Sequence, residues 1–279
     1  MNPSAGGKAA HVAFAARSLG ADVTWMAFLG GPEGDACAQG VKSHGITSIR
    51  ISIAERTRTN LELCESDNGT VTEILEPGPT ISSDEAADFL AKFENKVRDF
   101  TAVVISGSLP RGLNPDFYVE LIAIAKRAGC RVLLDSSGPS LAKSLKAGPD
   151  VIKPNRQEVS AILDRKINNT DEALSAANEL RSLGAGIAIV SLGEQGAVVA
   201  TSAGAMLGTP PDVSVNSAVG SGDAFLAGWT VAELQGKDAA DCLRVAIACG
   251  AANCSAESPG EIDPSTVREL ISKVRIESY

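Results

Sequence analysis

Residues 219–229 read VGSGDAFLAGW, with two glycines around a serine and an aspartate directly after them. Ala224, Gly228 and Val231 lie at i, i+4 and i+7, which is the spacing of a buried helix face. A helix is therefore expected to begin near residues 221–222. Its first turn leaves backbone N–H groups without partners and carries partial positive charge. Glycine lets a ligand approach the backbone closely, so this turn can hold an anion such as phosphate.

Asp223 follows the glycines and is expected at the rim of that anion site. A carboxylate beside a phosphate is electrostatically unfavourable, which suggests a task such as accepting a proton. The alternative is that Asp223 only caps or charges the first helical turn. The local pattern leaves both interpretations open.

Composition limits the classes of protein to consider. The 279 residues, 44% of them hydrophobic, suit one large globular domain, or one domain with a small appendage. The net charge is −9 and no run of Lys or Arg stands out, so nucleic acid is not an expected partner. No apolar stretch reaches the roughly 20 residues that span a bilayer, and a secretory signal pattern is absent. The six cysteines form no CxxC pair and indicate buried thiols in a cytoplasmic protein.

Helical and strand patterns alternate along the chain. Expected helices cover 8–19, 82–100, 115–128, 171–183, 222–235, 239–256 and 264–274, with one more after Pro154; expected strands cover 22–28, 101–105, 131–135, 150–153 and 186–190. This order predicts a mostly parallel sheet covered on both faces, with ligands beyond the carboxyl ends of the strands. Residues 46–75 instead alternate with period two around a turn signal at 67–69, which predicts a β-ribbon.

Polar clusters follow several of these strands and are expected to meet at one edge of the sheet. Neither GxxxxGK[ST] nor GxGxxG after the first strand occurs, which disfavours a P-loop or a Rossmann dinucleotide site. Asn155 and Glu158 lie three apart at a helix start and suit a Mg²⁺ ion that keeps most of its water, or they form a capping pair. Arg58, in the expected ribbon, can grip a phosphate, or it is a solvated charge.

Together these motifs resemble the ribokinase-like (PfkB) carbohydrate kinases, in the branch of 1-phosphofructokinase and tagatose-6-phosphate kinase. The resemblance covers the whole chain and is carried by GGK at 6–8, TRTN at 57–60, EPGP at 76–79, SGSLP at 106–110, KPNRQE at 153–158, SLGEQGA at 191–197 and GSGDAFLAG at 220–228. It implies an α/β fold, a ribokinase-like three-layer sandwich with a mostly parallel central sheet. Residues 1–279 then form a single kinase domain, to which 46–76 contribute a small β-ribbon lid.

The resemblance also implies roles for individual residues. The catalytic group is an anion hole of Gly220, Ser221 and Gly222 with Asp223 as the base that takes the proton of the attacking hydroxyl. The residues implied for the sugar or its phosphate are Gly6, Gly7, Lys8, His11, Arg58 and Ser108. Those implied for ATP are Lys153, Ser191, Gly193, Gly196 and, near the adenine, Asn253. Asn155 and Glu158 would hold Mg²⁺ through water.

The implied activity is ATP-dependent, Mg²⁺-requiring phosphorylation of a ketohexose phosphate. Fructose 1-phosphate is the first expectation and tagatose 6-phosphate the second. The alternatives are a kinase of an unphosphorylated sugar or nucleoside, and a catalytically weak relative that binds nucleotide or sugar. The expected partners are small molecules, in the cytoplasm, with no membrane or nucleic acid; a homodimer through the ribbon is also an expectation.

Three departures from the family pattern bear on these expectations. His11 stands where relatives carry Asn, and Phe14 stands where this branch usually carries Arg. Phe14 either removes a phosphate partner or restores an apolar helix face. The chain also begins almost at the GGK turn, whereas relatives carry strands and a sugar-binding aspartate before it. Weak or no kinase activity is therefore an expectation for these 279 residues.

Overall fold

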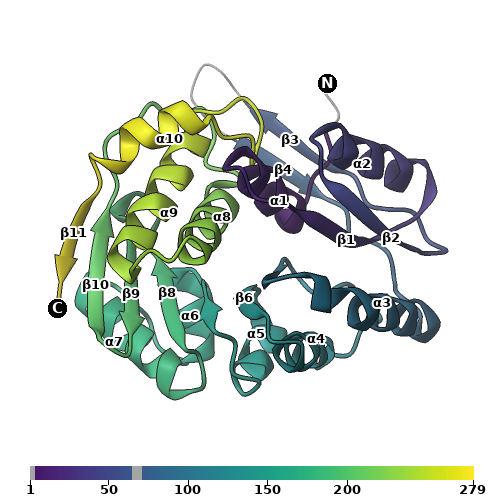
Figure 1. Ribbon diagram of the computed structural model, residues 1–279, viewed down its shortest axis with the longest axis horizontal. Coiled ribbons are helices and arrows are strands. Elements are labelled where there is room, and N and C mark those ends of the chain that lie inside the picture. Colours follow the sequence, from purple (N-terminus) through teal and green to yellow (C-terminus); the bar gives the residue numbers. More distant parts are fainter. Residues whose placement is uncertain (1–3, 65–70) are drawn as a thin grey trace.

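A seven-stranded sheet forms the middle layer of the structure, which is a computed structural model describing residues 4–64 and 71–279 (Figure 1). Its strands, in spatial order, are β11 (Arg275–Ser278), β10 (Gly204–Thr209), β9 (Ala197–Thr201), β8 (Ile187–Ser191), β7 (Val151–Ile152), β6 (Arg131–Asp135) and β5 (Ala102–Ser106). The pairs from β5 to β8 are parallel, and those from β8 to β11 are antiparallel. The expected parallel sheet is therefore extended by an antiparallel edge.

Helices cover both faces of this sheet, which gives three layers (Figure 1). One face carries α3 (Ser83–Lys96), α4 (Phe117–Arg127), α5 (Gly138–Leu145), α6 (Arg156–Ile162) and α7 (Thr170–Ser182). The other carries α1 (Lys8–Ser18), α8 (Ser221–Leu234), α9 (Ala239–Cys254) and α10 (Pro264–Ile271). Two short 3-10 turns, η1 (Val97–Asp99) and η2 (Gly193–Gln195), complete the set.

Successive side chains of the central strands point to opposite faces of the sheet, and so each strand contributes to both hydrophobic cores. In β6, Leu134 packs into the core under α3–α7, and its neighbour Leu133 packs into the core under α8 and α9. Ile152 and Val151 of β7 divide in the same way. Both faces of a strand are buried here, which explains why these strands read as continuous apolar runs.

A smaller parallel unit lies beside the main sheet. It consists of β1 (Thr24–Leu29), α2 (Gly31–Ser43) and β2 (Thr47–Ser52), and β1 pairs with β2 in parallel. Among the described residues, neither strand hydrogen-bonds to the seven-stranded sheet. The packing of α1 against this unit through Phe14, which is 3% exposed, closes a third hydrophobic cluster. Phe14 therefore supports the apolar-face alternative.

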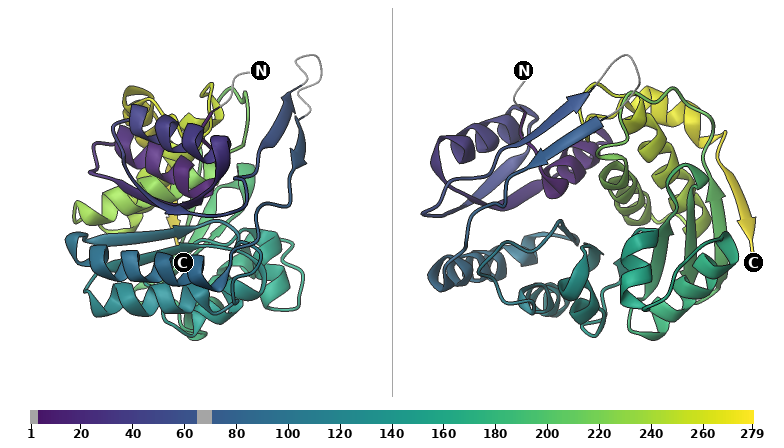
Figure 2. Two further views of the ribbon diagram at one scale, coloured as in Figure 1. Left: turned by 90° about the vertical axis from the view of Figure 1, so that its right-hand side faces the viewer. Right: turned by 180° about the vertical axis from the view of Figure 1, so that it is seen from behind.

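The β-ribbon is shorter than the sequence predicted. Only β3 (Asn60–Cys64) and β4 (Val71–Leu75) pair as antiparallel strands, and they project away from the layered body (Figure 2). The prediction that the ribbon begins at residue 46 was wrong, because β2 belongs to the parallel unit. Period-two alternation marks any strand with one buried face, whichever partner it has. The expected turn at 67–69 lies outside the described residues.

Helix α8 begins at Ser221, as the glycine motif predicted, and is buried from Asp223 to Ala232. A Cβ atom on Gly228 would lie 2.7 Å from Cys249 Sγ, so this glycine lets α9 pack closely against α8. Such packing fixes the start of α8 against the sheet. Separately, none of the helices in the described part of the chain has the length and hydropathy needed to cross a membrane.

Candidate active site

The start of α8 offers two backbone donors without acceptors. Gly220 precedes the helix with φ 80° and ψ −6°, a left-handed conformation that favours glycine. The N–H groups of Ser221 and Asp223 donate to the carbonyls of Ala218 and Gly220. In the described ranges, the N–H groups of Gly220 and Gly222 meet no such acceptor. Two free amides at the positive end of a 14-residue helix form a site suited to an anion.

Asp223 lies beside these amides and is 4% exposed. Its Oδ2 lies 3.1 Å from His11 Nδ1, on the adjacent helix α1. The carboxylate accepts no hydrogen bond from a backbone amide of the described residues, so it does not cap α8. This geometry favours the interpretation of Asp223 as a functional carboxylate.

A buried ion cluster continues the site toward the sheet. Asp135, at the carboxyl end of β6, is 1% exposed and lies 3.4 Å from Lys8 Nζ through Oδ1. Its Oδ2 lies 3.0 Å from Lys153 Nζ, without the alignment of a hydrogen bond. The Lys153 ammonium in turn lies 3.3 Å from the point where a Cβ on Gly222 would stand. Lys153 is therefore buried next to Gly222 at the start of α8.

The charge balance of this cluster acts on Lys8. Burial disfavours the charged ammonium, but the carboxylates of Asp135, Asp223 and Glu158 outweigh that effect and raise the pKa of Lys8 above its ordinary value. Lys8 therefore stays cationic at neutral pH. The same pattern indicates that all three carboxylates face one region, which is where α1, β6, α6 and α8 meet.

Asn155 and Glu158 adopt the capping alternative. Asn155 Oδ1 accepts the N–H of Glu158 at 2.9 Å, and Glu158 Oε2 accepts the N–H of Asn155 at 2.8 Å, which is a reciprocal capping box at α6. Glu158 Oε1 has no hydrogen-bond donor within residues 4–64 and 71–279. One carboxylate oxygen therefore remains free at the edge of the ion cluster.

The nucleotide-side residues lie after β8, next to α6. The backbones of Ser191 and Asn155 pair in an isolated parallel β-bridge. The turn η2 begins at Gly193, which has φ 64°. No atom lies within 4 Å of a Cβ built on Gly193, so its backbone is accessible. Gly196 has a structural role instead, since a Cβ there would lie 1.9 Å from the carbonyl oxygen of Gly208.

Asn253 lies beneath the anion site and is only 2% exposed. Its Nδ2 donates to the Val219 carbonyl at 2.7 Å and to Ser221 Oγ at 3.3 Å. Its Oδ1 accepts the N–H of Gly260 at 2.7 Å. A side chain so enclosed offers no surface to an adenine ring. The expected adenine contact is therefore replaced by a supporting role under the glycine turn.

The expected sugar side is built from two turns. Gly7 precedes α1 with φ 99°, and a Cβ on Gly107, next to Ser108, would lie 3.8 Å from the Lys8 side chain. The GGK turn and the turn after β5 therefore meet at Lys8. Ser108 is exposed there and makes no side-chain hydrogen bond to a described residue.

Arg58 does not lie in the ribbon but in the connection between β2 and β3, where its side chain is exposed. A Cβ on Gly78 would lie 3.2 Å from Arg58 Cδ, so the EPGP turn supports this arginine. Arg111 Nη2 donates to the carbonyl of the same Gly78 at 2.6 Å. Two arginines therefore contact the EPGP turn at Gly78.

Sequence reasoning missed two of these residues. Asp135 ends the apolar strand RVLLD, and a carboxylate at the carboxyl end of a buried strand was the signal that could have found it. Arg111 follows SGSLP directly. Arg111 is thus adjacent to a recognised motif, and Asp135 is the last residue of an expected strand.

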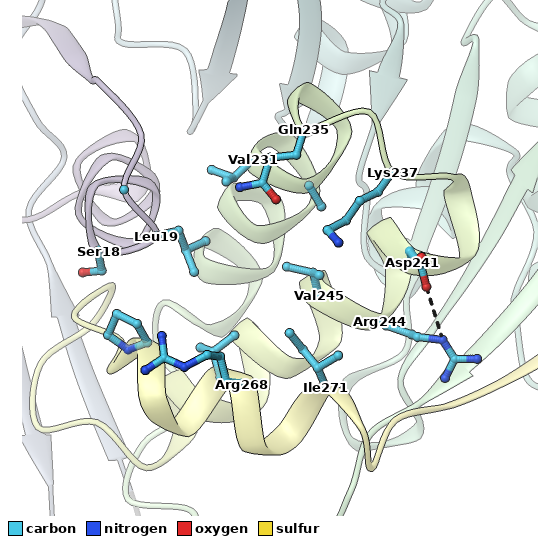
Figure 3. A pocket seen from close by; sticks show the side chains of 14 residues that line it. Ser18, Leu19, Val231, Gln235, Lys237, Asp241, Arg244, Val245, Arg268 and Ile271 are labelled. Carbon is cyan, nitrogen blue, oxygen red and sulfur yellow. Dashed lines mark ion pairs between the residues drawn. The ribbon is translucent and has the colours of Figure 1, made fainter.

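A pocket of about 390 Å³ lies away from this site, between α1, α8, α9 and α10 (Figure 3). Leu19 and Val231 form part of its apolar wall, and the ammonium of Lys237 points into it. Leu19 directly follows the carboxyl end of α1 and Val231 lies in the last turn of α8, whereas Lys8 and Asp223 lie at the amino ends of these helices. The pocket is therefore separate from the ion cluster.

Free helix amides, a buried lysine and an adjacent carboxylate are the groups that phosphoryl transfer needs for positioning and charge neutralisation. On this fold they form a candidate phosphotransferase site. Residues 1–266 match the family described as pfkB family carbohydrate kinase, and the chain belongs to this family.

Individual relatives agree with this assignment. The chain is 35% identical to 1-phosphofructokinase of Rhodobacter capsulatus, over 93% of this chain and 81% of that protein. It is 32% identical to tagatose-6-phosphate kinase of Staphylococcus epidermidis, over 98% and 88%. Among solved structures it is similar to phosphofructokinase-2 from Escherichia coli, with a TM-score of 0.88 and 28% identity over 96% of this chain and 87% of that one. The predicted family and the ribokinase-like fold are confirmed.

Proposed function

We propose that this carbohydrate kinase transfers the terminal phosphoryl group of ATP to a hydroxyl of a ketohexose phosphate. The reaction is fructose 1-phosphate to fructose 1,6-bisphosphate, or tagatose 6-phosphate to tagatose 1,6-bisphosphate. The observation that carries the proposal is the buried Asp223 carboxylate beside the free amides of Gly220 and Gly222. The names of the relatives supply the substrate class.

In this proposal each group has a separate task. Asp223 accepts the proton of the attacking sugar hydroxyl, which is general base catalysis. The amides of Gly220 and Gly222, with the Lys153 ammonium, stabilise negative charge on the transferring phosphoryl group. Ser191 and Gly193 lie toward the remaining phosphates of ATP. Because all these donors are held by helix starts and strand ends, little reorganisation is needed when charge develops.

The residues present also fit the Mg²⁺ ion that kinases of this family use with ATP. Glu158 Oε1 has no donor among the described residues, and Asp135 Oδ2 is buried without an aligned hydrogen bond. Both oxygens can accept hydrogen bonds from the waters that Mg²⁺ retains, together with Asn155. When bound, the ion would neutralise phosphate charge. In the described residues no group of three or more acidic, His or Cys side chains forms a closed metal cage, which is consistent with a hydrated ion.

The phosphate already on the acceptor sugar is assigned to Arg58, with Arg111 beside it. Arginine binds phosphate through two parallel hydrogen bonds, and both guanidinium groups lie close to the turn at Gly78. Ser108 and the GGK turn at Lys8 would hold the sugar itself. Phe14 is buried and takes no part in this recognition.

We further propose that the chain acts as one kinase domain with the β3–β4 ribbon as its lid, and that two copies pair through that ribbon. Ile74 and Leu75 of the ribbon are large apolar side chains that are 53% and 60% exposed, and a second copy could cover them. A structure of the E. coli relative is described as the tetrameric inhibited form.

A cytoplasmic location fits the free state of the five described cysteines.

The experiment is a coupled ADP-release assay with Mg-ATP over a panel of acceptors. Fructose 1-phosphate, tagatose 6-phosphate and fructose 6-phosphate are compared with fructose, ribose and adenosine. The proposal expects the highest kcat/KM with a ketohexose phosphate. A preference for an unphosphorylated sugar or nucleoside would select the first alternative, and nucleotide binding without turnover of any acceptor would select the second.

A further inference from the structure

His11 contacts the carboxylate that is proposed as the base, and nothing in the proposed reaction so far uses this contact. Its Nδ1 lies 3.1 Å from Asp223 Oδ2, and the two side chains are 14% and 6% exposed. Within the described residues, this imidazole is the one hydrogen-bond partner of the Asp223 carboxylate. The orientation of the base therefore depends on His11.

The chemistry of the two groups fixes the direction of the hydrogen bond. An ionised carboxylate only accepts hydrogen bonds, so the proton between the two atoms belongs to Nδ1. In a neutral imidazole the other nitrogen, Nε2, then carries a lone pair. A Cβ on Gly6 would lie 3.8 Å from this Nε2, so the lone pair faces the glycine turn of the proposed sugar site. Asp223 Oδ1 stays available for the attacking hydroxyl.

The backbone of His11 is held as closely as its side chain. A Cβ on Gly260 would lie 2.7 Å from His11 Cα, so α1 packs directly on the turn at Gly260. That turn is bound to Asn253, which also holds the start of α8 through Val219. One set of contacts therefore fixes both partners of the His11–Asp223 pair relative to each other.

We infer that His11 is a positioning residue: its Nδ1–H holds the Asp223 carboxylate in the orientation that receives the sugar proton, and its Nε2 accepts a hydrogen bond from a second sugar hydroxyl. This inference rests on the proposed function, since it assumes that Asp223 is the base. It assigns His11 two distinct contacts, one for each ring nitrogen.

Substitution of His11 by Asn or by Gln tests the two contacts separately, because each amide side chain can replace only one of the ring nitrogens. The amide nitrogen of Asn occupies the position of Nδ1, whereas that of Gln reaches the position of Nε2. His11→Asn is therefore expected to keep kcat within about threefold of the natural protein and to alter mainly KM for the sugar. His11→Gln and His11→Ala lose the hydrogen bond to an ionised group, which is expected to lower kcat about 10- to 100-fold. In an Asp223→Asn background, His11→Ala is expected to lower kcat no further.

A spectroscopic measurement tests the same contact without substrate or turnover. The chain has two histidines, and His44→Asn leaves one imidazole to observe by ¹⁵N NMR. His44 pairs with Glu261 at 2.9 Å outside the site, so this variant is also expected to keep full activity. The Nδ1–H tautomer is expected at neutral pH. In the additional presence of Asp223→Asn the tautomer is expected to change, because an amide can donate to Nδ1.

The outcomes separate the inference from the function it rests on. An Nε2–H tautomer in the His44→Asn protein overturns the inference, and so does His11→Asn that is as slow as His11→Gln while both melt like the natural protein. If the NMR result agrees but no acceptor is phosphorylated, the proposed function fails and the Nδ1–Asp223 contact stands.

Discussion

Removing the charge of Asp135 is expected to unfold the protein more readily, because this carboxylate is the counter-ion of a buried lysine. Asp135 and Lys153 have side chains that are 1% and 5% exposed, with 3.0 Å between Oδ2 and Nζ. Asp135→Asn keeps the shape and leaves the Lys153 ammonium without a compensating charge. Breaking one side of a buried pair costs about 3–5 kcal/mol. Lys8, whose side chain is 46% exposed, contributes less because water screens it.

This free energy converts into a measurable shift of the melting temperature. An unfolding entropy of about 2.1 cal/mol/K per residue gives roughly 0.59 kcal/mol/K for 279 residues, so Tm is expected to fall by about 5–9 °C. The assay is a thermal melt followed by circular dichroism, with urea titrations at 25 °C to obtain the free energy of unfolding. Asp116→Asn is the matched control, since its pair with Lys143 lies on the surface with both side chains nearly half exposed.

A second substitution identifies the cause. Asp135→Asn combined with Lys153→Met removes the stranded charge and is expected to recover most of the lost stability, as a double-mutant cycle would report. Combination with Lys8→Met is expected to recover little. The reasoning is refuted if Asp135→Asn shifts Tm no more than Asp116→Asn does, or if Lys153→Met brings no recovery.

Further predictions concern catalysis, packing and pH. Asp223→Asn is expected to leave ATP binding nearly intact and to lower kcat by roughly 10²–10⁴, and near-normal turnover would remove its role as base. Arg58→Ala is expected to raise KM for the sugar phosphate far more than KM for ATP, since each lost charge-assisted hydrogen bond is worth about 1.5–3 kcal/mol; equal effects on both would contradict the assignment. Gly228→Ala forces a Cβ to 2.7 Å from Cys249 Sγ and is expected to cost about 1–3 kcal/mol of stability by urea titration. Burial raises the pKa of Cys249 to about 12 from an ordinary value of 9.0, so the unfolded chain ionises first and stability is expected to fall between those two pH values. Cys249→Ala should flatten that part of the pH profile by about 1.4 kcal/mol per pH unit, and an unchanged slope would count against the shift.

Local signals predicted the helix ends well. The helix expected from residue 82 starts at Ser83, behind a capping box of Ser82 and Glu85, and α8 starts where the glycine turn indicated. Both signals depend on atoms within one turn of each other, so a sequence window contains all the physics. The same holds for Asn155 and Glu158, whose spacing is satisfied by capping alone.

Features that depend on distant partners were predicted less well. Helix α2 was missed because GPEGDACAQGVKS contains three glycines and little apolar periodicity, and its stability comes from packing Val41 against β1 and α1. Strand β2 was assigned to the ribbon because alternation does not identify the neighbouring strand. Asn253 matched a nucleotide segment, yet its partners at Val219 and Gly260 are fixed only by tertiary structure.

Helix α1 is shared between two hydrophobic cores, which has a mechanical consequence. Ala13 and Phe14 pack into the cluster with β1 and α2, while Val12 and Ala15 pack into the core with α8. The helix thus connects the smaller parallel unit to the main body through side chains packed in both cores. If α1 moved by about 1 Å away from α8, the 3.1 Å hydrogen bond between His11 and Asp223 would break. The contact between His11 and Asp223 therefore depends on the smaller parallel unit as well as on the main body, since α1 packs against both.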